Sequence, residues 1–330
     1  MKSRRVAGWL RGVGVGMGMG MGVGVGVALG AMSAPSTAHA APLQCPAAES
    51  PAPDSGLAVM PGVLGYTMQS AVNGQRYRIW IHRPSATVQA PPGGFPVLYV
   101  LDGNATFVLA AQAARLQERV TGGLIVVGVD APGNALFDLP SRYRDLTSLA
   151  PPDAWGVPRG KDGAPLKTGG ADAFREVLVD EVPAVVDACA HADRQRTTLF
   201  GHSLAGYFVL HTMFTHPDSF GRYIAASPSI WWNDRAVLKD LLSFGSDTKK
   251  SLHLMVGGSE QTLADTATAA RVERVTHAAM NDNVQAMYAR LKQTHGNDVD
   301  VSLDVFSGAN HVSYLPAALS EAVTEAAAQH

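Results

Sequence analysis

The sequence predicts an α/β protein built on one central, mostly parallel sheet with helices on both faces. Three observations support this fold class. Several short, continuous apolar runs are typical of strands buried on both faces of a sheet. Helical patterns lie between many of these runs, and alternation of strands with helices produces a parallel sheet. The 330 residues, 46% of them hydrophobic and 16% charged, suffice for one large core.

The first 40 residues differ from the rest of the chain. They combine an apolar run rich in Gly, Val and Met with four basic residues, Lys2, Arg4, Arg5 and Arg11. Small residues follow, with an A-x-A pattern ending at Ala40, so this segment is predicted to be a secretory signal peptide cleaved there. A membrane anchor is the alternative, but the frequent glycines make the run a poor membrane helix. The choice between Sec and twin-arginine export stays open.

Loss of this segment has consequences for charge and location. Removing four basic residues takes the formal net charge from −2 to −6. A mildly acidic chain without a basic stripe is unsuited to binding nucleic acid. We therefore expect a periplasmic or secreted protein that is soluble after cleavage and makes no stable membrane insertion.

Residues 41–62, rich in Pro, Ala and Ser, predict a tail before a single domain over residues 63–330. The chain has two cysteines, Cys45 and Cys189. They form either one disulfide or two unpaired thiols, and the sequence leaves both open. An H-E-x-x-H motif and a Cys/His cluster are both missing, so no metal and no cofactor are expected.

Seven runs are predicted to be strands. The first, residues 76–84, alternates polar and apolar side chains, so we expect it to pair antiparallel near an edge of the sheet. The other six cover residues 96–103, 124–130, 197–203, 222–229, 251–258 and 299–308. The helical patterns between them cover residues 107–120, 171–190, 204–217 and 281–295.

Residues 138–170 break this alternation. They show no clear period and contain many Pro and Gly residues. Irregular segments of this length are uncommon inside domains and often serve a site. We expect this loop to act as a lid or as a wall of the site.

The stretch "TTLFGHSLAGYF" (residues 197–208) places Ser203 between a buried strand and a helix. This is the context of a nucleophile elbow, in which a strained turn projects the serine hydroxyl alone into the site. Residues two before and two after the serine must be small because strand and helix nearly touch, and Gly201 and Ala205 meet this requirement. Ser203 is the predicted nucleophile.

A serine hydroxyl needs a base, and His311 follows the last predicted strand in a loop. Glu260, just after the strand at 251–258, is the candidate for the acid that orients this histidine. Asp265 is the alternative acid, and a Ser–His dyad without an acid is another. The backbone amides of Leu204 and Gly103 are the candidate oxyanion-hole donors.

Six motifs together resemble the α/β-hydrolase esterases of the esterase-D-like group: "VLYVLDGNATF", "SRYRDLT", "GGADAF", "GHSLAGYF", "ASPSIWW" and "GANHVSYLP". Within that group the chain is most similar to periplasmic siderophore esterases that act on enterobactin-type trilactones. The resemblance covers about residues 63–325. It implies that Ser203 and His311 are catalytic and that Gly103 and Leu204 donate to the oxyanion. The chain departs from the pattern at Ala205, where many members have glycine.

The predicted function is an exported serine carboxylic-ester hydrolase that works through an acyl-enzyme, on a siderophore trilactone or an aryl ester. An acyltransferase or thioesterase of the same fold is the alternative within enzymes. A catalytically inactive ligand-binding module is the alternative from another class, but it would be expected to lack Ser203 or His311, and both are present.

Four residues are predicted to bind the substrate: Arg142, Arg144, Trp231 and Trp232. The two tryptophans follow a strand near the nucleophile, where ligands bind beyond the carboxyl ends of strands. The arginines begin the irregular loop and can pair with an anionic or catecholate oxygen. The alternative is structural: one tryptophan belongs to the core, and one arginine pairs with a loop carboxylate such as Asp145.

Overall fold

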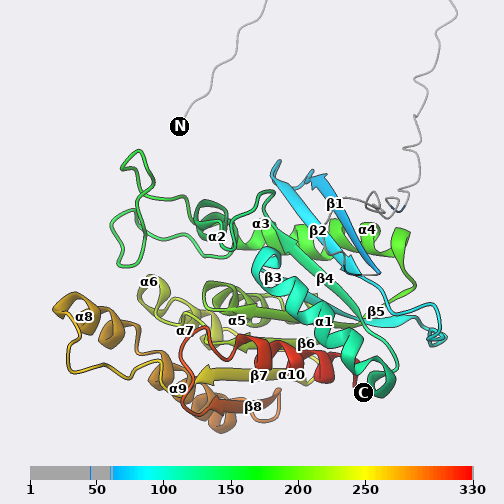
Figure 1. The fold of residues 1–330 in the computed structure, drawn as a ribbon. Coiled ribbons are helices and arrows are strands. Elements are labelled where there is room, and N and C mark those ends of the chain that lie inside the picture. Colours follow the sequence, from blue (N-terminus) through cyan, green and yellow to red (C-terminus); the bar gives the residue numbers. More distant parts are fainter. Residues whose placement is uncertain (1–44, 46–59, 61, 329–330) are drawn as a thin grey trace, which may run out of the picture. The chain divides into compact units, whose positions relative to one another are not determined.

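The computed structural model describes residues 45, 60 and 62–328 (Figure 1). The predicted signal peptide, residues 1–40, and nearly all of the predicted tail, residues 41–62, lie outside the described residues. The described residues fall within one unit, Leu43–His330. Among them, no helix has both the length and the apolar character needed to cross a membrane.

Within the described residues, eight strands form one sheet in the order β1-β2-β4-β3-β5-β6-β7-β8. All neighbours from β4 to β8 pair parallel, whereas β2 pairs antiparallel with both β1 and β4. The bounds are β1 Val63–Gln69, β2 Arg76–His82, β3 Phe95–Leu101, β4 Ile125–Asp130, β5 Ala192–His202, β6 Arg222–Ala226, β7 Lys250–Gly257 and β8 Val299–Phe306. The predicted α/β class with a mostly parallel sheet is confirmed.

The edge strand β1 was not predicted. Only one of its side chains, Leu64, is buried, so its apolar pattern is weak. A Cβ on Gly65 would lie 2.8 Å from the Trp80 ring. The indole of Trp80 on β2 therefore packs directly against the backbone of β1 at Gly65. The antiparallel pairing expected for β2 is confirmed, although β2 lies one strand in from the edge.

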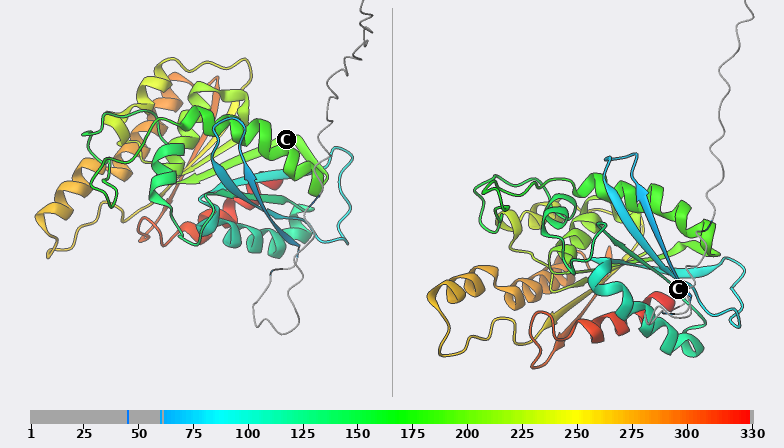
Figure 2. Two further views of the ribbon diagram at one scale, coloured as in Figure 1. Left: turned by 90° about the horizontal axis from the view of Figure 1, so that it is seen from above. Right: turned by 45° about the horizontal axis from the view of Figure 1, so that its top comes forward.

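Helices cover both faces of the sheet (Figures 1 and 2), and a hydrophobic core lies beneath them on each face. Helices α1 (Gly103–Thr121) and α10 (Leu315–Ala327) cover one face, while α4 (Val182–Cys189), α5 (Leu204–Thr215) and α9 (Met280–Thr294) pack on the other. Alternate residues of β3 divide between these cores, with Leu98 in one and Tyr99 in the other. Burial on both faces explains why β3 is continuously apolar in sequence.

The predicted helix at 171–190 consists of α3 (Ala171–Glu176), a π-helical turn (Val177–Glu181) and α4. Pro183 lies in the first turn of α4, where its missing N–H is tolerated. The π-helical turn, which is wider than an α-helical turn, lies directly before α4. The remaining helices are α2 (Leu139–Asp145), the short 3₁₀ turn Pro217–Ser219, α6 (Trp232–Arg235), α7 (Val237–Leu242) and α8 (Ala269–Ala278).

The segment at 138–170 is therefore not entirely irregular, because it begins with α2. The side chain of Asp138 caps this helix by accepting a hydrogen bond from the Ser141 amide at 2.9 Å. Pro140 occupies the first turn, where proline favours helix initiation. These local signals were present in the sequence, but the proline-rich stretch that follows obscured them.

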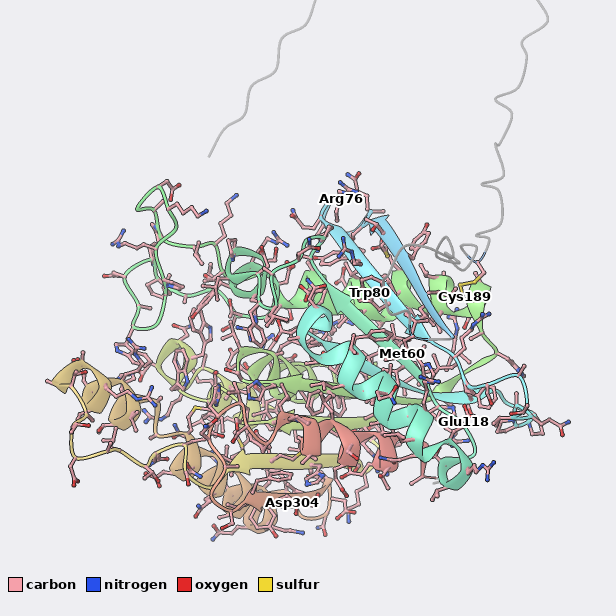
Figure 3. The ribbon with its side chains drawn as sticks, in the orientation of Figure 1. Met60, Arg76, Trp80, Glu118, Cys189 and Asp304 are labelled. Carbon is pink, nitrogen blue, oxygen red and sulfur yellow. A yellow bond between two sulfur atoms is a disulfide. The ribbon has the colours of Figure 1, made fainter. Side chains whose placement is uncertain are left out.

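Cys45 and Cys189 form a disulfide, which settles the alternative that the sequence left open. Cys189 lies at the end of α4 (Figure 3), and the bond spans 144 residues of the chain. A cross-link over such a long loop restricts the unfolded chain strongly.

We predict that replacing both cysteines, Cys45→Ala with Cys189→Ala, lowers the free energy of unfolding by about 2–5 kcal/mol, because the unfolded chain regains the entropy of the opened loop. Urea unfolding of the wild type and the double variant, both without added oxidant or reductant, measures the difference in the free energy of unfolding. A reductant should lower the midpoint of the wild type only. Equal midpoints for both proteins without reductant would contradict the prediction.

Candidate active site

The turn between β5 and α5 holds Ser203 in an unusual backbone conformation, with φ 61° and ψ −116°. Residues other than glycine rarely adopt positive φ. Two hydrogen bonds fix this turn: the Ser203 amide donates to the Ala226 carbonyl at 2.9 Å, and the Ser203 carbonyl accepts from the Ser229 amide at 3.0 Å. The Ser203 side chain thereby reaches a cavity at the carboxyl ends of the strands.

Close packing explains the small residues around Ser203. A Cβ on Gly201 would lie 2.3 Å from the carbonyl oxygen of Ala205, so any side chain there would push α5 away from β5. A Cβ on Gly206 would lie 2.9 Å from the carbonyl oxygen of Ala226 on β6. The methyl group of Ala205 is itself fully buried, so the departure from glycine at this position is accommodated.

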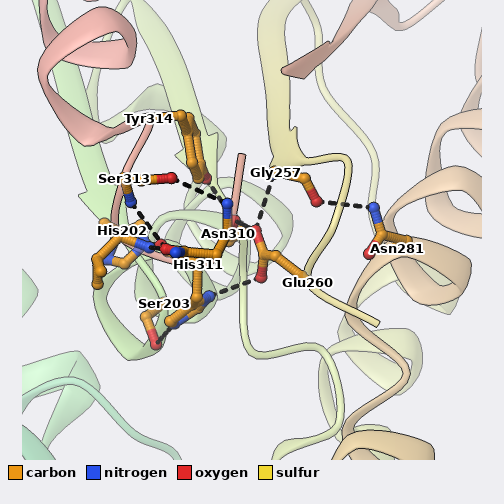
Figure 4. A network of polar contacts seen from close by, with 11 residues as sticks. His202, Ser203, Gly257, Glu260, Asn281, Asn310, His311, Ser313 and Tyr314 are labelled. Carbon is orange, nitrogen blue, oxygen red and sulfur yellow. Dashed lines mark hydrogen bonds and ion pairs between the residues drawn. The ribbon is translucent and has the colours of Figure 1, made fainter. Parts of the chain in front are cut away.

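Ser203, His311 and Glu260 form one chain of hydrogen bonds (Figure 4). His311 Nε2 lies 3.0 Å from Ser203 Oγ, and His311 Nδ1 lies 2.6 Å from Glu260 Oε2. Because a carboxylate only accepts, Nδ1 carries the proton, which leaves Nε2 free to accept from the serine hydroxyl. The His311 side chain is 40% exposed, whereas that of Glu260 is 1% exposed.

The buried carboxylate of Glu260 is held on its other oxygen as well. Oε1 accepts hydrogen bonds from the Gly257 amide at 2.8 Å and from the Ser227 hydroxyl. The Ser227 hydroxyl in turn contacts the hydroxyl of Tyr314, whose pKa is raised by burial. The structure thus places Glu260 beside His311, whereas the alternative acid, Asp265, is exposed and has no contact with this histidine.

His202 supports the His311 loop, a role that sequence reasoning missed. Burial, and to a smaller extent the nearby His311, lowers the pKa of His202 to about 3, so this ring is neutral. Its Nε2 therefore donates to the carbonyl oxygen of His311 at 2.6 Å. Side-chain alternation along β5 was the available signal, because His202 and Phe200 point to the face covered by α10, next to the His311 loop.

The amides of Gly103 and Leu204 are the first of α1 and α5, and within the described chain neither has an acceptor. In the parallel register of β3 and β5, Val100 pairs with Phe200, so Gly103 and Ser203 lie at matching positions beyond the two strands. Adjacent strands are about 4.8 Å apart. Both amides are thus at the edge of the sheet where Ser203 lies.

Arg142 forms an ion pair with Asp102 directly before Gly103. Its Nε and Nη2 donate to the two carboxylate oxygens at 2.7 and 3.0 Å. Asp102 has a left-handed backbone conformation, φ 54° and ψ 50°, and the bidentate pair ties it to α2. Arg142 therefore holds the backbone that presents the Gly103 amide.

The structure places one of the four predicted substrate-binding residues at the cavity and the other three elsewhere. Arg142 pairs with Asp102, and Arg144 pairs with Asp145, as its structural alternative anticipated. Neither arginine lines the cavity. Trp232 is fully buried in the core, and Trp231 is the one of the four that lines the cavity.

The cavity that contains Ser203 and His311 has a volume of about 640 Å³. Its walls come from α2, the loop after it, the segment after β6, α8 and the start of α9. The residues are Leu139, Tyr143, Trp155, Gly156, Val157, Pro158, Ser203, Ser229, Trp231, Glu260, Arg271, Arg274, Val275, Ala278, Met280 and His311. The expectation that the loop at 138–170 forms a wall of the site agrees with this lining. Sequence reasoning missed Trp155, Arg271 and Arg274.

No group of three or more His, Cys, Asp and Glu side chains within residues 62–328 is arranged to hold a metal ion. Another hollow, of about 690 Å³, is lined by Ser85 and His82 among others, but the Ser85 hydroxyl donates to Glu118 and not to a histidine.

Comparisons with known proteins identify relatives that are esterases. A family model described as "Putative esterase" matches residues 70–325. The ferri-bacillibactin esterase BesA of Bacillus subtilis is 34% identical over 270 residues, which cover 80% of this chain and 89% of that protein. The siderophore enterobactin esterase of Emericella nidulans is 34% identical over 242 residues, covering 68% of this chain and 79% of that protein.

Among solved structures, the BES protein from Bacillus cereus superposes with a TM-score of 0.69 and 29% identity, covering 82% of this chain and 97% of that one. The siderophore hydrolase EstA from Aspergillus nidulans gives a TM-score of 0.67 at 28% identity, covering 81% and 94%. With the family match and these relatives, the chain belongs to the esterase family and is a carboxylic-ester hydrolase with the α/β-hydrolase fold.

Proposed function

We propose that the chain hydrolyses siderophore esters through an acyl-enzyme on Ser203, with His311 as the base and Glu260 as the acid that orients it. The observation that supports this proposal is the hydrogen-bonded chain from Ser203 Oγ through His311 to Glu260, with Ser203 and His311 lining the cavity. A nucleophile, its base and an orienting carboxylate in contact are what acyl transfer through serine requires.

In the first half of the reaction, Ser203 Oγ attacks the ester carbonyl carbon while His311 Nε2 takes the hydroxyl proton. The carbonyl oxygen becomes an oxyanion, which the amides of Leu204 and Gly103 stabilise by hydrogen bonds. His311 then gives its proton to the oxygen of the leaving alcohol as the C–O bond breaks. An acyl-enzyme on Ser203 remains.

In the second half, water replaces the alcohol. His311 takes a proton from the water as its oxygen attacks the acyl carbon, then returns the proton to Ser203 Oγ as the acid leaves. Throughout, Glu260 keeps the imidazole proton on Nδ1 and stabilises the imidazolium form. His202 holds the backbone of His311 in place through its carbonyl oxygen.

The substrate class is inferred from the relatives and from the cavity. Curated relatives are named as esterases of ferri-bacillibactin and enterobactin. A cavity of about 640 Å³ is in the size range of small-molecule sites. The Trp155 and Trp231 rings, with centroids 4.9 Å apart, line this cavity and offer an aromatic surface to an aryl group of the substrate.

We predict that Ser203→Ala lowers kcat by about 10⁴-fold or more, because the nucleophile is lost. His311→Ala should have a similar effect, and the double variant should be little worse, since the two side chains act as one unit. Steady-state kinetics with an aryl ester measure these effects. His216→Ala, an exposed histidine outside the cavity, is the control and should keep full activity. Multiplicative losses in the double variant would contradict the pairing.

Glu260→Gln should lower kcat by about 10²–10⁴-fold, because an amide no longer fixes the His311 tautomer or stabilises the imidazolium. The matched control is Asp265→Asn, which changes an exposed carboxylate and should leave kcat unchanged. Thermal unfolding of each variant separates loss of activity from loss of structure. Near-wild-type activity in a folded Glu260→Gln enzyme would show that Ser203 and His311 work as a dyad.

We also propose that the protein is exported after cleavage near Ala40, since residues 1–40 have the pattern of a signal peptide and the chain forms a disulfide. Expression of the full chain in a bacterial host should give a mature protein beginning near Ala41 in the soluble exported fraction. Intact-mass spectrometry of that fraction checks the cleavage. Full-length protein recovered from the membrane fraction would contradict it.

A further inference from the structure

One face of α8 lines the same cavity as Ser203. Arg271, Arg274, Val275 and Ala278 all contribute to its wall. Their spacing, i, i+3, i+4 and i+7, places them on one side of a helix. Two guanidinium groups therefore border the same cavity as the candidate nucleophile.

The hydrophobic core does not account for α8. None of its residues is buried, and the helix lies to one side of the sheet (Figures 1 and 2). The Trp155 ring connects it to the loop after α2, because the His277 and Trp155 ring centroids lie 3.8 Å apart. Trp155 in turn contacts Trp231. These contacts hold α8 at the cavity.

Both arginine side chains are exposed and place positive charge along the cavity wall. Within the described residues neither side chain forms an ion pair or a hydrogen bond, in contrast to Arg142 and Arg144. Glu260 supplies the one carboxylate in the cavity lining, and this carboxylate is buried and already accepts a hydrogen bond from His311. Like charges three residues apart on a helix also repel each other. A ligand with negative charge would relieve this repulsion.

Aromatic rings stand in the same wall. Trp155 and Trp231 present their surfaces to the cavity that the arginines border. Guanidinium groups bind anionic oxygens in pairs of hydrogen bonds and also stack on aromatic rings. Aromatic side chains and unpaired guanidinium groups in one cavity fit a ligand that is both aromatic and anionic.

We propose that Arg271 and Arg274 recognise the negative charge of an iron-bound catecholate ester, so that the enzyme favours an anionic ferric catecholate over an uncharged ferric complex. The inference rests on the proposed function, because it places the substrate of Ser203 in this cavity. In this arrangement the guanidinium groups contact catecholate oxygens, the tryptophans contact the catechol rings, and an ester carbonyl reaches Ser203.

The test compares two iron complexes of cyclic triesters. Ferric enterobactin, a catecholate, carries a net negative charge, whereas ferric triacetylfusarinine C, a hydroxamate, is uncharged. The ratio of kcat/KM for the first complex to that for the second is measured in the wild type and in the double variant Arg271→Gln with Arg274→Gln. A charge-preserving double variant, Arg271→Lys with Arg274→Lys, is measured alongside. Arg290→Gln on α9 removes a positive charge outside the cavity lining and is the matched control.

The glutamine double variant should lower this ratio by roughly tenfold or more, and the lysine double variant should recover part of the loss. The ratio of the wild type should also fall as salt is added, because salt screens exposed charges. Arg290→Gln should not change it. A Kd for ferric enterobactin that rises in the glutamine variant, measured by tryptophan quenching in a Ser203→Ala background, would support recognition in binding.

An unchanged ratio in the glutamine variant would overturn the inference, as would equal proportional losses on both complexes. Hydrolysis of p-nitrophenyl butyrate separates this failure from failure of the proposed function. If that hydrolysis survives Ser203→Ala, the proposed function is overturned and the inference with it. If it depends on Ser203 while the ratio stays unchanged, only the anion recognition is overturned.

Discussion

The positive φ of Ser203 depends on how closely β5, β6 and α5 approach one another. Gly201 has no room for a side chain because the Ala205 carbonyl lies against it, and Gly206 is confined in the same way by β6. The Ser203 amide, which precedes the helix, donates a hydrogen bond to the Ala226 carbonyl of β6. The strained turn is therefore stabilised by three elements at once, and its hydroxyl is directed outward as a result.

The sheet order then brings the other groups to this turn. β5, β6, β7 and β8 are neighbours and run parallel, so the residues that follow them meet at one edge. Ser203 follows β5, Ser227 follows β6, Glu260 follows β7 and His311 follows β8. The segment after each of these strands contributes at least one polar group to a single hydrogen-bonded network, part of which is shown in Figure 4. The site therefore depends on the topology as much as on the motif around the serine.

This topology explains what the sequence could and could not predict. Ser203, Glu260 and His311 each follow a predicted strand, so their order along the chain made them candidates, but the sequence left the choice among Glu260, Asp265 and a dyad open. The ion pair between Arg142 and Asp102 could not be predicted, because Asp102 lies 40 residues earlier and sequence does not reveal which charges pair over such a distance. Helix α8 was missed for another reason: its sequence, AARVERVTHA, has only two large apolar side chains, Val272 and Val275, and none of its residues is buried in the core.

Within this network we propose that His311 activates Ser203, and covalent labelling of the serine can test that activation. A fluorophosphonate reacts with an activated serine hydroxyl and leaves a stable adduct, which peptide mass spectrometry can locate. We expect one adduct, on the peptide that contains Ser203, and a much slower reaction in the His311→Ala variant. No adduct on the folded wild-type protein, or an adduct on a different serine, would contradict it.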